Sequence, residues 1–182
     1  MEFERLAIPD VVLIRPKVFE DGRGFFFESW QKRRFAEAGI DADFVQDNHS
    51  RSVANTLRGL HYQVEQTQGK LVQVTSGTVF DVAVDLRRSA PTFGRWVGVE
   101  LSGENHHQLW VPPGFAHGFL VLTAMAEFSY KCTDYYAPAH ERSIRWDDPD
   151  IGIRWPLPEG VSPVLSRKDA AGVPLRSAET FP

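Results

Sequence analysis

The chain has 182 residues, of which 42% are hydrophobic and 24% are charged, and its formal net charge is −4. These values are typical of one folded globular domain and exclude an intrinsically disordered chain. The sequence has no cluster of basic residues that would bind the backbone of a nucleic acid. A few well-placed arginines are nevertheless enough to hold one small diphosphate.

The sequence lacks the usual marks of export or membrane insertion. Cys132 is the only cysteine, so no intrachain disulfide can form, and this favours a reducing compartment. Acidic residues and the Pro9-Asp10 pair interrupt the N-terminal apolar run, unlike a signal peptide, and no stretch is long and apolar enough to span a membrane. We therefore expect a cytoplasmic protein.

The first predicted element is a helix over residues 30–38. Ser29 precedes it as a candidate N-cap, and Gly39 follows it where a residue in the left-handed conformation commonly ends a helix. From about residue 154 the chain is rich in Pro and Gly. We expect this tail to wrap the surface with a turn or two of helix.

The rest of the chain is typical of an all-β protein, because short apolar segments alternate with turn signals such as Ser76-Gly77 and Pro113-Gly114. The clearest strand, residues 78–86, places four apolar side chains on one face and its two aspartates, Asp81 and Asp85, on the other. Further strands are predicted over residues 70–75, 95–101, 115–122 and 127–135. Because no linker or repeat interrupts the chain, we expect one domain over residues 1–182.

His61 is a candidate general base because imidazole titrates near neutral pH, but a lone histidine in a strand is also commonly a hydrogen-bonded structural residue. Strand alternation puts Arg58 and His61 on opposite faces, so they share a pocket only if Gly59 forms a bulge. Lys70 opens the next strand. It either stabilises an oxyanion inside a barrel or is a solvated strand-end residue.

Other polar and aromatic residues allow two interpretations each. On an unbroken strand Tyr130 and Tyr136 point the same way. One of them then donates a proton while the other stacks on a base or sugar, or both simply pack against the core. Arg23, in a glycine-flanked loop, suits a phosphate clamp or a surface turn. His117 follows a tight turn at a strand start, where barrel sites often lie, and Asp169 either orients a histidine or caps a helix.

Taken in order, these motifs resemble the dTDP-4-dehydrorhamnose 3,5-epimerase family. The resemblance extends from about residue 5 to about residue 172. One departure is the loop over residues 64–69, which is about one residue shorter than the family pattern. The most specific matching segments are RGLHYQ (58–63), VFDVAVDLR (79–87), LWVPPGFAHGF (109–119) and YKCTDYY (130–136).

The resemblance implies a fold and an activity. The fold is a cupin-like jelly roll, or double-stranded β-helix, with a few short peripheral helices. The protein is expected to be a homodimer in which the N-terminal segment, about residues 1–50, contributes to the partner's site. The implied reaction inverts C3 and C5 of dTDP-4-keto-6-deoxy-D-glucose without a cofactor or metal, through an enolate, and gives dTDP-4-keto-6-deoxy-L-mannose, the precursor of L-rhamnose.

The resemblance also assigns roles to matched residues. His61 matches the general base, and Asp169 matches the carboxylate that orients it. Lys70 matches the residue beside the C4 oxygen, and Tyr130 matches the proton donor. Tyr136 matches the ring that stacks on thymine. The other matched substrate contacts are Arg23, Glu28, Gln46, Asn48, Arg58, His117, Glu141 and Lys168.

Four alternatives remain open. Some relatives invert only C3 or only C5 and keep the same histidine and tyrosine, so the motifs do not separate them from double epimerases. A 3,4-ketoisomerase acts on a similar substrate, but the motifs here are closer to the epimerases. A non-catalytic nucleotide-sugar-binding module is a third alternative, but the presence of His61, Lys70, Tyr130 and Asp169 together argues against it. A metal-dependent oxygenase is disfavoured, because no His-x-His pair occurs and His49, His61 and His117 form no tight ligand cluster.

Overall fold

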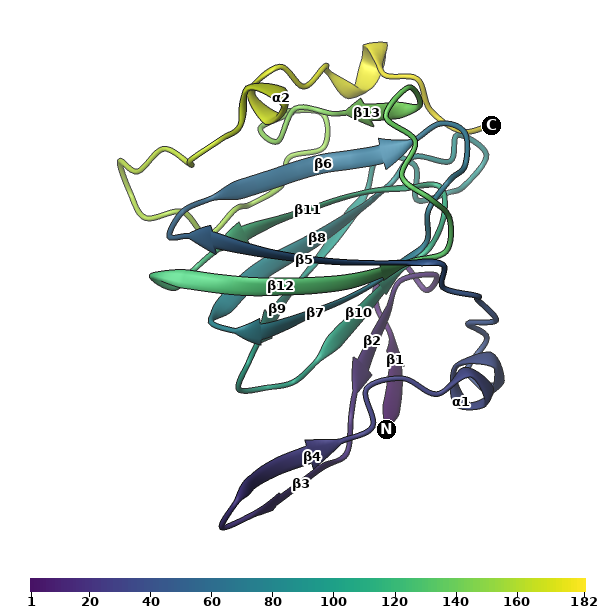
Figure 1. Cartoon of the computed structure of the whole chain (residues 1–182). Coiled ribbons are helices and arrows are strands. Elements are labelled where there is room, and N and C mark those ends of the chain that lie inside the picture. The colour runs from purple at the N-terminus through teal and green to yellow at the C-terminus, as the bar shows by residue number, and fades with distance from the viewer.

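The computed structural model describes all 182 residues, Met1–Pro182, as two facing β-sheets with a projecting hairpin (Figure 1). The six-stranded sheet has the order β1-β2-β10-β7-β12-β5, and the five-stranded sheet has the order β13-β6-β11-β8-β9. Neighbouring strands in both sheets are antiparallel. This arrangement confirms the all-β prediction.

The strands of the six-stranded sheet are β1 (Glu2–Arg5), β2 (Val12–Arg15), β5 (Gln46–Val53), β7 (Lys70–Ser76), β10 (Gln108–Val111) and β12 (Met125–Cys132). Those of the five-stranded sheet are β6 (Leu57–Gln63), β8 (Thr78–Asp85), β9 (Trp96–Ser102), β11 (Phe115–Val121) and β13 (Glu141–Ser143). The hairpin consists of β3 (Val18–Asp21) and β4 (Gly24–Phe27). The helical elements are α1 (Lys32–Glu37), α2 (Arg167–Ala170) and the 3-10 helix η1 (Leu175–Ser177).

Two predicted elements need correction. The helix is shorter than predicted, because Gln31 rather than Ser29 is its N-cap and accepts a hydrogen bond from the Arg34 amide at 2.8 Å. Gly39 follows the helix with a φ of +86°, as expected. The strand predicted over residues 127–135 ends at Cys132, because its pairing with both neighbouring strands ends there.

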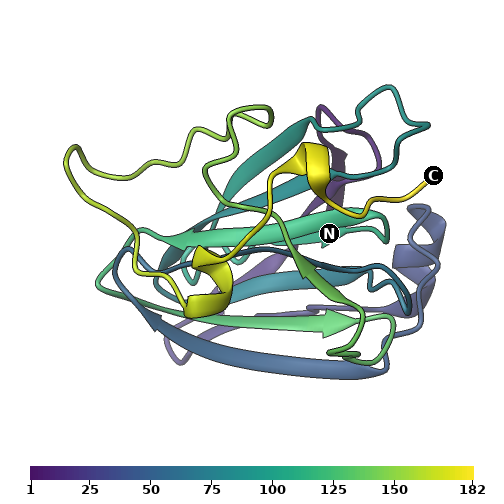
Figure 2. The same cartoon turned by 90° about the horizontal axis from the view of Figure 1, so that it is seen from above.

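The core consists of layers on both sides of the five-stranded sheet. Val79 and Ala83 of β8 face the interior between the sheets, whereas Val82 and Val84 face outward. The C-terminal tail covers this outer face, as Figure 2 shows from above, and contains the short helices α2 and η1. Because the tail covers the outer face, β8 is buried on both sides, and its interior face carries the fully buried Asp81 and Asp85 beside Val79 and Ala83.

Candidate active site

A polar cavity of about 410 Å³ opens between the two sheets. Its walls come from β5, β6, β7, β11 and β12, with residues of β13 and α2 at its rim. Ten of the thirteen predicted site residues line it, and the structure therefore gathers side chains that are far apart in sequence. The lining residues are Gln46, Asn48, His49, Ser50, Arg58, His61, Gln68, Lys70, His117, Phe119, Phe128, Tyr130, Tyr136, Glu141 and Lys168.

A glycine bulge brings Arg58 and His61 into this cavity together. The three residue steps from Arg58 to His61 on β6 span only two steps on β11, so β6 carries one extra residue. Gly59 lies in the bulge with a φ of +132°, and a Cβ atom there would be 2.5 Å from the Gly118 Cα atom. Only glycine fits where the two strands approach so closely. The bulge at Gly59, which strand alternation required if Arg58 and His61 were to share a pocket, is therefore present.

Asp169 makes both of the contacts that its sequence context allows, one to a histidine and one at the start of a helix. Its Oδ1 atom lies 2.6 Å from His61 Nε2 and also accepts a hydrogen bond from the Gly59 amide at 3.2 Å. Its Oδ2 atom accepts from the Ser166 hydroxyl at 2.6 Å, in a capping box at the start of α2. The carboxylate that contacts the histidine is thus held by the helix that presents it.

The electrostatics of this pair favour a neutral imidazole beside an ionised carboxylate. Burial raises the pKa of Asp169, but hydrogen bonds from His61, Ser166 and Gly59 outweigh it and hold the pKa well below its usual range. Burial lowers the pKa of His61 despite the bond to Asp169. Because the carboxylate accepts from Nε2, the hydrogen-bond network assigns the proton to Nε2 and leaves Nδ1 free to accept one.

Lys70 and Tyr130 approach the cavity from the adjacent strands β7 and β12. Burial lowers the pKa of the Lys70 ammonium. Burial also raises the pKa of Tyr130 to about 12, so its hydroxyl stays protonated at neutral pH. The cavity therefore holds a candidate base, a lysine amine that can donate a hydrogen bond and a phenolic proton donor.

His117 forms a second histidine–carboxylate pair in the same cavity. Its Nε2 atom lies 2.9 and 3.0 Å from the two carboxylate oxygens of Asp81, which is fully buried on β8. Burial raises the pKa of Asp81, and the contact with His117 opposes this shift. The aspartate face that the sequence predicts for β8 is therefore part of the interior of the barrel.

Tyr136 lies at the mouth of the cavity, beyond the end of β12, and is 51% exposed. Its hydroxyl donates to Glu141 at 2.8 Å, and the Lys168 ammonium donates to the same carboxylate at 2.6 Å. Tyr130 and Tyr136 thus line one cavity although they do not share a strand. An exposed aromatic ring fixed by a hydrogen bond is suited to stack on a base.

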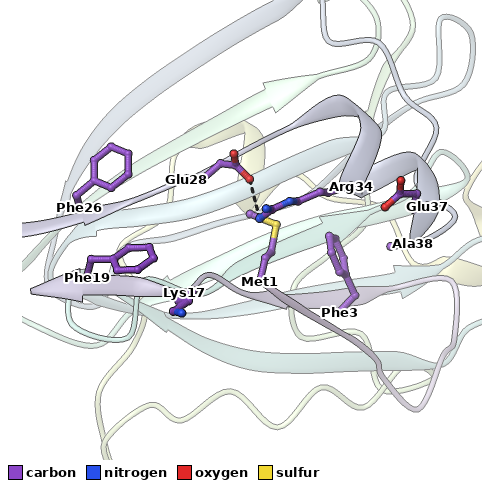
Figure 3. Close-up of a pocket in the computed structure, with 9 residues that line it drawn as sticks. All are labelled: Met1, Phe3, Lys17, Phe19, Phe26, Glu28, Arg34, Glu37 and Ala38. Atoms are coloured by element: carbon purple, nitrogen blue, oxygen red, sulfur yellow. Dashed lines mark ion pairs between the residues drawn. The ribbon is translucent and has the colours of Figure 1, made fainter.

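Arg23 and Glu28 are the two predicted residues that lie away from this cavity. Arg23 is at the tip of the β3–β4 hairpin, which projects from the barrel in Figure 1, and is paired with Asp21 at 2.6 Å. Glu28 lines a separate hollow between the hairpin, β1 and α1, where it pairs with Arg34 at 3.1 Å (Figure 3). Within one chain, neither residue reaches the barrel cavity.

Five lining residues were missed by the sequence interpretation: His49, Ser50, Gln68, Phe119 and Phe128. Strand alternation was an available signal for the two phenylalanines, because each lies two positions from a predicted site residue on the same strand. Their rings stack with centroids 4.2 Å apart. They form an apolar wall in an otherwise polar cavity.

No group of three or more His, Cys, Asp or Glu side chains is placed to hold a metal ion. No helix is long and apolar enough to cross a membrane.

Comparison with known proteins gives a consistent result. The sequence profile described as dTDP-4-dehydrorhamnose 3,5-epimerase matches residues 5–177. A protein of that name from Pseudomonas aeruginosa is 60% identical over the full length of both chains. A crystal structure of the 3,5-epimerase from Legionella pneumophila, in complex with dTDP-4-keto-L-rhamnose, has a TM-score of 0.94 at 57% identity and covers 98% of this chain and 94% of that one.

A solved structure with a different specificity is also similar. The 3′-monoepimerase from Streptomyces bikiniensis, in complex with dTDP-quinovose, has a TM-score of 0.87 at 34% identity, covering 94% of this chain and 87% of that one. The likeness of all these structures confirms the expected cupin-like fold.

Proposed function

Because the chain belongs to the dTDP-4-dehydrorhamnose 3,5-epimerase family, we propose that it inverts C3 and C5 of dTDP-4-keto-6-deoxy-D-glucose to give dTDP-4-keto-6-deoxy-L-mannose. The observation that carries the proposal is one cavity in which the His61–Asp169 pair meets Lys70 and Tyr130. The identity of 60% to a double epimerase, against 34% to the monoepimerase, favours inversion at both centres.

The chemistry follows from the ketone at C4, which acidifies the protons on C3 and C5. Neutral His61 accepts one of these protons at Nδ1, and Asp169 stabilises the resulting imidazolium. Lys70 donates to the C4 oxygen as the enolate forms, and one such donor is typically worth about 3–4 kcal/mol. Tyr130 returns a proton to the opposite face of the carbon, and the centre is inverted.

The remaining cavity residues bind the nucleotide sugar. Arg58 suits the diphosphate because its planar guanidinium matches two phosphate oxygens. Tyr136 stacks on the thymine, with Glu141 fixing its hydroxyl. The other proposed contacts are Gln46, Asn48, His117 and Lys168.

A second copy of the chain completes the site. Phe19, Phe25 and Phe26 of the hairpin are 54%, 60% and 69% exposed, and such a cluster of large apolar side chains is typical of an interaction surface. We propose a homodimer in which each hairpin brings Arg23 and Glu28 to the partner's cavity. This arrangement gives both residues access to the substrate, which neither has within its own chain.

The reaction is tested by incubating the protein with dTDP-4-keto-6-deoxy-D-glucose in deuterated water. NMR measures the deuterium at each carbon, and a 4-keto reductase with NADPH traps the product. Label at C3 and C5 with dTDP-L-rhamnose formed supports the proposal. Label at one carbon with a different trapped sugar indicates a single-centre epimerase, and no label above that of a His61→Asn control indicates a binding module.

A further inference from the structure

The segment that carries Tyr136 has almost no backbone hydrogen bonds of its own. Over residues 134–137, which follow the end of β12, the only backbone–backbone bond runs from the His140 amide to the Ala137 carbonyl at 3.0 Å. Buried backbone amides and carbonyls that are not paired with a neighbouring strand need other hydrogen-bond partners. The exposed ring of Tyr136 therefore depends on side chains for its position.

Three glutamine side chains supply these partners to four consecutive residues. Each comes from a different part of the barrel, so together they fix the segment from several directions. The bonds are Gln68 Nε2 to the Asp134 carbonyl (2.8 Å), Gln63 Nε2 to the Tyr135 carbonyl (3.2 Å), the Tyr136 amide to Gln46 Oε1 (2.9 Å) and the Ala137 amide to Gln63 Oε1 (2.9 Å).

Gln63 is the central member of this set. It is 4% exposed and provides two of the four bonds, and its Nε2 atom also donates to the Gln66 carbonyl at 2.7 Å. It thus joins the segment that carries Tyr136 to the loop over residues 64–69. Gln63 does not line the cavity, whereas Gln46 and Gln68 do. Any effect of Gln63 on the substrate must pass through another residue.

We propose that Gln63 is a positioning residue for nucleotide recognition, acting by holding the backbone on both sides of Tyr136. The inference rests on the proposed function, because it takes Tyr136 to contact the nucleotide. A side chain fixed in its bound position loses less entropy when the ligand binds. Loosening the segment weakens nucleotide affinity without any lost contact to the ligand.

Lys70 and Tyr130 are anchored by contacts that do not involve Gln63. Lys70 follows Gly69, whose amide donates to the Thr133 hydroxyl at 2.8 Å and whose carbonyl accepts from the Thr133 amide at 3.0 Å. Tyr130 lies within the ladder between β12 and β7. The turnover number is therefore expected to change less than the substrate affinity.

The test is Gln63→Met, which keeps the side-chain length and removes all three hydrogen bonds. We expect KM for the nucleotide sugar and the inhibition constant of dTDP to rise about tenfold, with kcat within about twofold of the original value. Gln73→Met is the matched control. Gln73 bonds to Gln108 at 2.9 Å and does not line the cavity, so both constants should stay unchanged.

A double-mutant cycle separates positioning from a general loss of structure. In a Tyr136→Ala background, Gln63→Met should raise KM little further, because the ring it positions is gone. Additive effects, or a fall in kcat at unchanged KM, would overturn the proposal.

A second variant, Gln63→Glu, serves if Gln63→Met does not fold. It keeps the acceptor for the Ala137 amide and should give an intermediate KM, and an unchanged KM counts against the proposal. If the wild-type protein does not introduce deuterium into the sugar, the proposed function itself is contradicted, and not only the role of Gln63.

Discussion

His117 on β11 lies directly opposite His61 on β6, and each imidazole contacts its own buried carboxylate through Nε2. The two pairs differ in how the carboxylate is solvated. Asp169 also accepts hydrogen bonds from Ser166 and Gly59, and its pKa is lowered, whereas Asp81 has only His117 and its pKa is raised. Asp169 therefore stays ionised beside its histidine more readily than Asp81 does, which supports His61 as the base.

Asp169→Asn is expected to lower kcat by about 10² or more, because the imidazolium of His61 loses its anionic partner and the tautomer is no longer fixed. The pH dependence moves as well. Activity requires neutral His61 and rises with pH through its pKa, which Asp169 raises. Removing that charge lowers the pKa, so the acidic limb of kcat/KM shifts to lower pH. Steady-state kinetics from pH 5 to 9 measures both effects.

Asp81→Asn is the matched control for this limb. It alters the carboxylate that contacts the other cavity histidine, His117, but leaves the His61–Asp169 contact in place. The acidic limb should then stay where it is in the unaltered protein. An equal shift in both variants would show that the limb does not report on His61.

Tyr130→Phe should separate proton removal from inversion. The phenol is the proposed donor on the far face of the ring, and its high pKa keeps it protonated. Without it, His61 still removes protons and returns them to the same face. We expect deuterium at C3 and C5 to accumulate about 10² faster than inverted product. Equal losses of exchange and inversion, measured by NMR, would contradict the assignment.

Lys70→Met is expected to lower kcat by about 10²–10³, the usual effect of losing one donor to a developing oxyanion. Because both centres react through an enolate at C4, exchange at C3 and at C5 should slow together. Lys70→Arg keeps the charge but changes its shape, so we expect partial activity. Slower exchange at only one carbon would place Lys70 elsewhere on the sugar.

The sequence predicted the cavity well wherever a motif carried the information. Strand alternation separated the two faces of β8, and it made a bulge at Gly59 the condition for Arg58 and His61 to share a pocket, a condition that the structure meets. The family resemblance supplied Lys168 and Glu141, which no local pattern indicates. Ten of the thirteen expected residues meet in one place because strands far apart in sequence pair in the barrel.

Other features depended on tertiary contacts that have no short-range signal. The end of β12 at Cys132 is set by its pairing with β5 and β7, not by the residues that follow it. The start of α1 depends on the Gln31 side chain. The glutamine bonds to residues 134–137 involve partners more than sixty residues away, for example between Gln68 and Asp134. Propensity rules describe neighbours in sequence and miss such contacts.

Two inactive variants should restore activity to each other if the hairpin acts across a dimer. Arg23→Ala and His61→Asn are each expected to be strongly impaired alone. Co-expressed with different affinity tags, they form a mixed dimer with one cavity that combines His61 of one copy with Arg23 of the other. That cavity is intact, so tandem-purified mixed dimer should show about half the activity of the original dimer, by arithmetic on its two sites. If Arg23 serves its own chain, both cavities of the mixed dimer stay impaired and no activity returns. Size-exclusion chromatography with light scattering confirms that the sample tested is a dimer, and a monomer at working concentration contradicts the shared site directly.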